Sequence, residues 1–201
     1  MVKCKLVNLE NLEIIDCRGG NTFFSSVVNQ SSNSLKKLFV KCQKYGDKEA
    51  LIFLYMVDTE MKCLKDLDVF QGGSQFLGLD NILSRSPLLQ KLKLTSPYDH
   101  KVSDHSIPID QSITGINVSG CELRCITKLV LSSVILEGCT LKNLLSNVPS
   151  LKELELNACI VKGNESITCV VTNLLRLQLN SRKEGEPVII IAPDLQVNFC
   201  I

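Results

Sequence analysis

The chain has 201 residues, of which 45% are hydrophobic and 21% charged. That much apolar material can bury a core and argues against global disorder. Lysine and arginine number 22 against 21 aspartates and glutamates, so the formal net charge is +1. A chain this close to neutral lacks the basic field that drives non-specific binding to nucleic acid or to an anionic membrane surface, and we expect neither as a partner.

The sequence shows no candidate leader or membrane segment. The residues after Met1 contain no apolar stretch of signal-peptide length. The longest apolar run, from Ala50 to Val57, is far shorter than the ~20 residues that span a bilayer. We therefore expect a cytoplasmic or nuclear protein whose ten cysteines stay reduced.

One apolar pattern, Leu-x-x-Leu-x-Leu, recurs from one end of the chain to the other. Its alternating Leu-x-Leu half is typical of a strand with one buried face. In chain order, the copies predict seven or eight short parallel strands centred near Leu12, Leu38, Leu67, Leu92, Leu129, Leu154, Leu177 and Val197. Most copies follow one another at or near the 20–29-residue period of leucine-rich repeats.

The segments between the strands carry helical patterns. One runs from Asp47 to Val57, and another from Thr140 to Val148, with Thr140 as a plausible N-cap and Pro149 just after the end. Alternating strands and helices predict an α/β leucine-rich-repeat solenoid, or horseshoe, with parallel strands on the concave face and helices or irregular turns on the convex face. No single repeat could bury its apolar face alone, so neighbouring repeats supply the core.

The array has one irregular region and two ends that look unfinished. The step from Leu92 to Leu129 is 37 residues long, and residues 97–122 within it are rich in turn formers. A second match to the pattern, from Ile113 to Cys121, indicates an extra strand or a loop there. The first and last strands lie close to the chain ends without polar capping repeats, so we interpret residues 1–201 as a single array truncated at both ends.

Residues that could carry chemistry have simpler structural explanations. Cys17, Cys159 and Cys200 each follow a strand motif at the position where a small thiol packs under the turn. The pair Cys121 and Cys125 lacks the second pair or nearby histidine that a zinc site needs. The two histidines lie together in a polar loop, and no glycine-rich phosphate loop or carboxylate pair stands out. We expect no catalytic residue, no cofactor and no metal ion.

What remains is a surface. The residues that flank the middle leucine of each strand should point away from the core and line the concave face. The candidate protein-binding residues are Lys37, Asp66, Asp68, Lys91, Lys93, Lys128, Glu153, Glu155, Arg176 and Gln178. An ordinary solvated face and a protein-binding groove both fit these mixed charges. As a groove, its central lysines could meet an acidic patch of a partner, with Glu153 and Glu155 beside them.

Three segments carry a resemblance to a known family. Residues Leu141–Cys159 read LKNLLSNVPSLKELELNAC, Leu83–Leu94 read LSRSPLLQKLKL, and Ile191–Leu195 read IAPDL. They resemble the repeats of plant F-box/leucine-rich-repeat proteins, the RNI-like group. The resemblance implies a substrate-recognition module of an SCF-type ubiquitin ligase. The F-box, which binds the Skp1 adaptor, is missing from this sequence, so a Skp1 partner is expected only for a longer form.

A second family shares part of the pattern. The sensor repeats of plant nucleotide-binding immune receptors also read LxxLxLxxC. The phrases Ser86–Leu92 and Ile191–Leu195 favour the F-box group. On either interpretation the chain is a non-enzymatic module that binds a protein.

Overall fold

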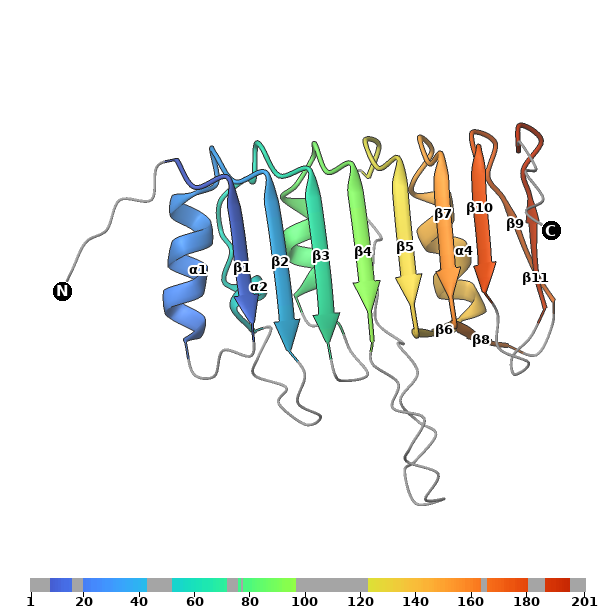
Figure 1. The fold of residues 1–201 in the computed structure, drawn as a ribbon, viewed down its shortest axis with the longest axis horizontal. Helices are drawn as coiled ribbons and strands as arrows, with labels where there is room; N and C mark the ends of the chain where they lie inside the picture. Colours follow the sequence, from blue (N-terminus) through green and yellow to red (C-terminus); the bar gives the residue numbers. More distant parts are fainter. Residues whose placement is uncertain are drawn as a thin grey trace, which may run out of the picture.

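The computed structural model describes residues 8–15, 20–42, 52–71, 76, 78–96, 123–163, 166–180 and 187–195. Its main feature is a seven-stranded parallel sheet with helices on one face (Figure 1). The strands are β1 (Asn11–Ile15), β2 (Lys37–Cys42), β3 (Asp66–Gln71), β4 (Lys91–Thr95), β5 (Lys128–Ser132), β7 (Glu153–Asn157) and β10 (Arg176–Asn180). They lie side by side in chain order, so the predicted α/β class and the seven parallel strands are confirmed. The eighth strand, predicted near Val197, lies outside the described residues.

The leucines of the repeated pattern form the core behind the sheet. Because side chains alternate across a strand, the middle leucine of each copy faces the helices. Leu38, Leu67, Leu92, Leu129 and Leu154 are each at most 1% exposed. The first leucine of most copies is buried in the turn that enters the strand, as with Leu64 and Leu89, whereas Leu9 before β1 is only partly buried. Each copy of the pattern thus adds one layer of buried apolar side chains to the core.

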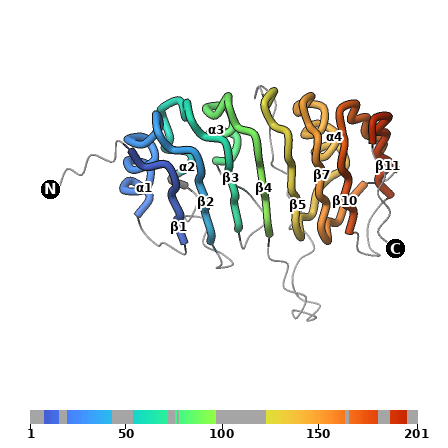
Figure 2. Tube along the Cα trace, turned by 45° about the horizontal axis from the view of Figure 1, so that its top comes forward, coloured from blue at the N-terminus to red at the C-terminus, as the bar shows by residue number. Residues whose placement is uncertain are grey.

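In the described part of the chain, helices cover one face of the sheet (Figures 1 and 2). They are α1 (Asn21–Gln30), α2 (Ile52–Tyr55), α3 (Leu79–Ser84) and α4 (Gly138–Ser146). The predicted helical stretch Asp47–Val57 contains α2, and its first five residues lie outside the described part of the chain. Side-chain amides tie neighbouring helices together: Asn81 Nδ2 donates to the backbone oxygens of Leu54 and Val57, at 2.8 Å each.

The predicted N-cap of α4 is wrong, whereas its end before Pro149 is confirmed. The helix begins at Gly138, and Glu137, whose backbone is extended, is the residue that precedes it. Thr140 lies inside the first turn and is buried. Gly138 permits the earlier start because it has no side chain: a Cβ there would lie 2.2 Å from Cδ1 of Ile167.

Within the described residues, two small sheets lie outside the repeated pattern. The strands β6 (Ile135–Glu137) and β8 (Ile160–Lys162) pair in parallel, as do β9 (Ile167–Val170) and β11 (Val188–Ile191). β9 packs against α4, so toward the C-terminal end strands take part in the layer that helices form elsewhere. None of these four strands is predicted by the repeated pattern.

The irregular step does not disturb the main sheet. β4 and β5 pair directly, with Leu92 opposite Leu129, in the same register as the other neighbours. Residues 97–122, with the predicted extra strand or loop, lie outside the described residues. None of the helices in the described ranges has the length and apolar character needed to cross a bilayer.

Candidate functional site

The face of the seven-stranded sheet that the helices leave uncovered, here called the open face, carries all ten predicted site residues. Its side chains form three rows that cross the strands, because the register aligns equivalent positions. The first row is Asn11, Lys37, Asp66, Lys91, Lys128, Glu153 and Arg176. The second row is Glu13, Phe39, Asp68, Lys93, Val130, Glu155 and Gln178. The third row is Ile15, Lys41, Phe70, Thr95, Ser132, Asn157 and Asn180.

Two ion pairs link β3 to β4. Lys91 Nζ lies 3.3 Å from Asp66 Oδ2, and Lys93 Nζ lies 2.9 Å from Asp68 Oδ2. Each pair joins neighbours within one row, so the register itself brings opposite charges together. The lysine side chains are a little over one third exposed, and each such pair contributes about 0.2–1 kcal/mol.

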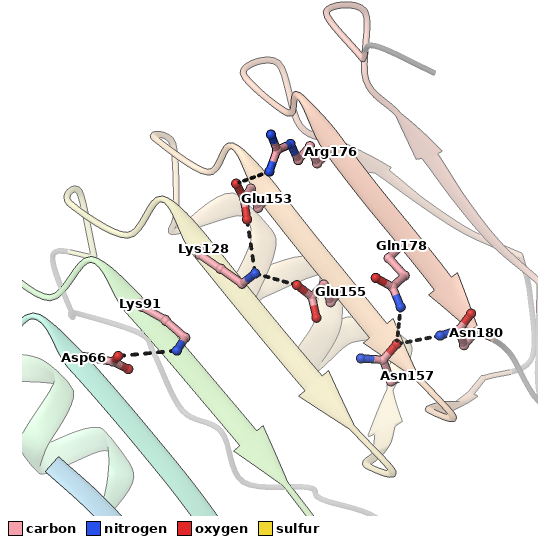
Figure 3. A network of polar contacts seen from close by, with 9 residues as sticks. All are labelled: Asp66, Lys91, Lys128, Glu153, Glu155, Asn157, Arg176, Gln178 and Asn180. Atoms are coloured by element: carbon pink, nitrogen blue, oxygen red, sulfur yellow. Dashed lines mark hydrogen bonds and ion pairs between the residues drawn. The ribbon is translucent and has the colours of Figure 1, made fainter. Parts of the chain in front are cut away.

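Lys128 on β5 is the centre of a larger network (Figure 3). Its Nζ lies 2.6 Å from Glu155 Oε1 and 3.1 Å from Glu153 Oε2, and both carboxylates stand on β7. Arg176 on β10 reaches the other oxygen of Glu153 at 3.2 Å. The hydrogen bond to Glu155 is the largest cause that raises the pKa of Lys128, followed on the raising side by the bond to Glu153, while partial burial opposes them.

This pairing changes the interpretation of the predicted lysine cluster. Lys91, Lys93 and Lys128 lie on adjacent strands as expected. Each already has a carboxylate partner within the sheet, so the three do not form a free basic patch. Charge in the central strands is therefore largely neutralised by the chain itself.

The third row was missed as part of the site. Lys41 Nζ lies 5.3 Å from the centre of the Phe70 ring, and Asn157 Oδ1 accepts hydrogen bonds from Asn180 (2.9 Å) and Gln178 (3.4 Å). The signal was available in the sequence. Side chains two residues apart on a strand point to the same side. The residue two positions after each second-row residue therefore also lies on the open face, and these residues make up the third row.

A hollow of about 550 Å³ lies in the open face over β1 to β4. Both ion pairs between β3 and β4 line it, together with Glu13, Lys37 and Phe39. Asp68 is one of the lining residues, and only one of its carboxylate oxygens, Oδ2, accepts a hydrogen bond from Lys93. The other, Asp68 Oδ1, is buried and has no hydrogen-bond partner among the described residues.

The cysteines in the described part of the chain form no disulfide with one another. Cys159 is buried, and its Sγ lies 3.2 Å from the backbone oxygen of Leu131, as a packing role predicts. Burial raises the pKa of the Cys169 thiol. Cys17 and Cys200 lie outside the described residues.

The other chemistry considered from the sequence falls largely outside the described ranges. His100, His105 and Cys121 all lie there, so the structure does not test the polar histidine loop or the cysteine pair. Within the described ranges, no three histidine, cysteine or acidic side chains gather as metal ligands would.

Comparison with known proteins does not identify the chain. Its sequence matches no protein-family model, no curated protein and no solved structure.

Proposed function

We propose that this chain is a leucine-rich-repeat array that acts as a non-enzymatic protein-recognition module, with the open face as its binding surface. The observation that carries the proposal is the alignment of three rows of mainly polar side chains across seven parallel strands. A surface of this kind offers ordered charges, amides and two aromatic rings along an extended face. Such order gives specificity and association rate more than raw affinity.

Within that class, we propose the recognition part of an SCF-type ubiquitin ligase. The support is the sequence resemblance of Leu83–Leu94, Leu141–Cys159 and Ile191–Leu195 to F-box/leucine-rich-repeat proteins. The 201-residue chain alone should not bind Skp1, since no segment of it resembles an F-box. Recovery of Skp1 in stoichiometric amount with the purified chain would contradict the proposal that these 201 residues supply only the recognition part. We place the protein in the cytoplasm or nucleus.

The test compares two faces of one molecule. A partner is first captured from an extract of the source organism, identified, purified and titrated against the chain. Lys93→Glu combined with Glu155→Lys reverses two open-face charges, while changes at Lys142 and Asn143 alter the exposed side of α4. We expect the open-face variant to weaken binding at least about tenfold and to change its salt dependence.

The α4 variant is the matched control and should leave the dissociation constant within about twofold of that of the wild type. Thermal unfolding of both variants checks that each remains folded. Equal loss of binding from the two faces would remove the open face as the site.

A further inference from the structure

The hollow over β1 to β4 contains charges that the described chain leaves unpaired. Glu13 and Lys37 line it, are exposed, and form no ion pair with any described residue. They stand on adjacent strands but in different rows, with Glu13 opposite Phe39 and Lys37 opposite Asn11. The hollow therefore differs from the Lys128 network, where the carboxylates of β7 already have cationic partners.

The second row places an aromatic ring between two carboxylates. Glu13 on β1, Phe39 on β2 and Asp68 on β3 are consecutive partners in the register. Asp68 Oδ2 lies 2.9 Å from Lys93 Nζ and accepts a hydrogen bond from it. The other oxygen, Oδ1, is buried and has no donor among the described residues. A buried acceptor without a partner is costly, and a donor supplied from outside would relieve that cost.

We propose that this hollow binds an arginine side chain of a partner protein, presented by an extended segment that carries an acidic residue two positions away. The inference rests on the proposed function and specifies the partner's chemistry. A guanidinium is planar, presents five donors and stacks on aromatic rings. Lying over Phe39, it can donate to Glu13 on one side and, once the Asp68 carboxylate turns its buried Oδ1 toward the hollow, to Asp68 on the other.

The acidic residue follows from the spacing of the first and second rows. Lys37 and Phe39 stand two residues apart on β2 and point to the same side, about 6.6 Å apart along the strand. An extended partner segment repeats its side chains on one side at the same distance. When the arginine of the partner segment lies over Phe39, the residue two positions away in that segment lies over Lys37. A carboxylate there would form an ion pair with the Lys37 ammonium group.

Two synthetic peptides test the proposal with the full 201-residue chain. They are acetyl-Gly-Glu-Gly-Arg-Gly-amide and acetyl-Gly-Arg-Gly-Glu-Gly-amide, which cover the two strand directions. In an NMR titration, we expect at least one of them to shift the amide signals of Phe39 and Asp68 saturably, with a dissociation constant of about 1 mM. The same peptide with citrulline in place of arginine keeps the shape and loses the charge, and it should bind at least about tenfold more weakly.

Variants locate the binding. Asp68→Asn should weaken it about tenfold or more, and Phe39→Leu about two- to fivefold. Glu60→Gln changes an exposed carboxylate outside both the hollow and the open face and should leave the constant within about twofold. If Asp68→Asn does not fold, Glu13→Gln at its exposed position takes its place, with an expected loss of about threefold.

Three results would overturn the proposal: no saturable shift up to about 10 mM peptide, equal binding of the citrulline peptide, or no effect of the hollow variants. Its failure is distinguishable from failure of the proposed function. If a captured partner loses binding with open-face changes on β5 to β10 but not with Asp68→Asn or Glu13→Gln, the open face remains the binding surface and the arginine site is wrong.

Discussion

At the scale of single residues, Cys159 tests the role of the thiol that follows a strand motif. It is 9% exposed, and its sulfur lies against the backbone of the neighbouring strand at Leu131. Cys159→Ser replaces a weakly polar sulfur with a hydroxyl that is costly to bury. We expect the free energy of unfolding, measured with denaturant, to fall by about 1–3 kcal/mol.

Cys139→Ser provides the matched control because Cys139 is exposed at the start of α4. Its free energy of unfolding should change by less than about 0.5 kcal/mol. A thiol reagent should label Cys139 quickly and Cys159 slowly in the folded protein. Rapid labelling of Cys159, or equal destabilisation by both substitutions, would contradict the packing role.

Ala158 holds a backbone conformation that glycine adopts more easily. Its φ is 52°, in the left-handed region, and Ser133 at the equivalent position after β5 has a φ of 54°. Both residues donate a short backbone hydrogen bond to the next strand, which keeps them in this turn. Ala158→Gly removes the Cβ strain of about 1–2 kcal/mol but adds entropy to the unfolded chain. We expect a net stabilisation of about 0.5–1 kcal/mol in denaturant unfolding.

Ala192→Gly separates the two contributions. Ala192 does not have a positive φ, so glycine there relieves no such strain; it brings the entropic cost and removes a methyl group that packs against the core. That variant should lose about 0.4–1 kcal/mol in the same denaturant assay. A loss of stability in Ala158→Gly as large as that in Ala192→Gly would mean that no strain is stored in the turn.

At the scale of elements, the Lys128 network joins β5, β7 and β10. Because the folded-state pKa of Lys128 is raised above its ordinary value of 10.5, its pairs stabilise the protein below that pH. This contribution is lost as the pH rises through the folded-state pKa. Lys128→Met should destabilise the chain by about 0.2–1 kcal/mol at pH 7, and the difference from wild type should shrink above about pH 10.5.

Urea unfolding at both pH values measures the change, and Lys36→Met is the control. Lys36 forms one pair with Glu10, in which both side chains are about half exposed. Its removal should cost less than that of Lys128 at pH 7. A Lys128→Met difference that stays constant from pH 7 to pH 11 would show that the lost stability is packing and not charge.

The repeated pattern predicts the main sheet well because one rule serves every strand. Leu-x-Leu fixes which side chains enter the core, and the common frame fixes the register, as the pairing of Leu92 with Leu129 across 37 residues illustrates. The strands β6, β8, β9 and β11 have no such frame. They are three or four residues long, and their pairing depends on neighbours that local sequence does not specify.

The candidate site is predictable only in part, for a related reason. Alternation alone places ten named residues on the open face, and all ten lie there. Which charges neutralise one another depends on side-chain reach, as when Lys128 contacts two glutamates of β7. The hollow with Phe39 and Asp68 depends in addition on depth and burial, which a repeat pattern does not encode.

At the scale of the whole molecule, stability should vary along the sheet. Each strand of the main sheet contacts its neighbours in chain order, so its stability comes chiefly from those interfaces. β3 has a partner on both sides and buries Leu67 completely. β10 is at an edge in the described part of the chain, and Leu179 on it is 49% exposed.

We therefore expect the amides of β3 and β4 to exchange with deuterium most slowly, and those of β10 to be among the fastest in the sheet, in native-state hydrogen exchange followed by mass spectrometry. Truncation of the same position in two repeats checks the cause. Leu67→Ala should cost about 2–5 kcal/mol, while Leu177→Ala, at a partly buried position on β10, should cost less than half as much. Uniform protection along the sheet with equal losses from both truncations would mean that the molecule opens as one unit, and the stability gradient would then be wrong.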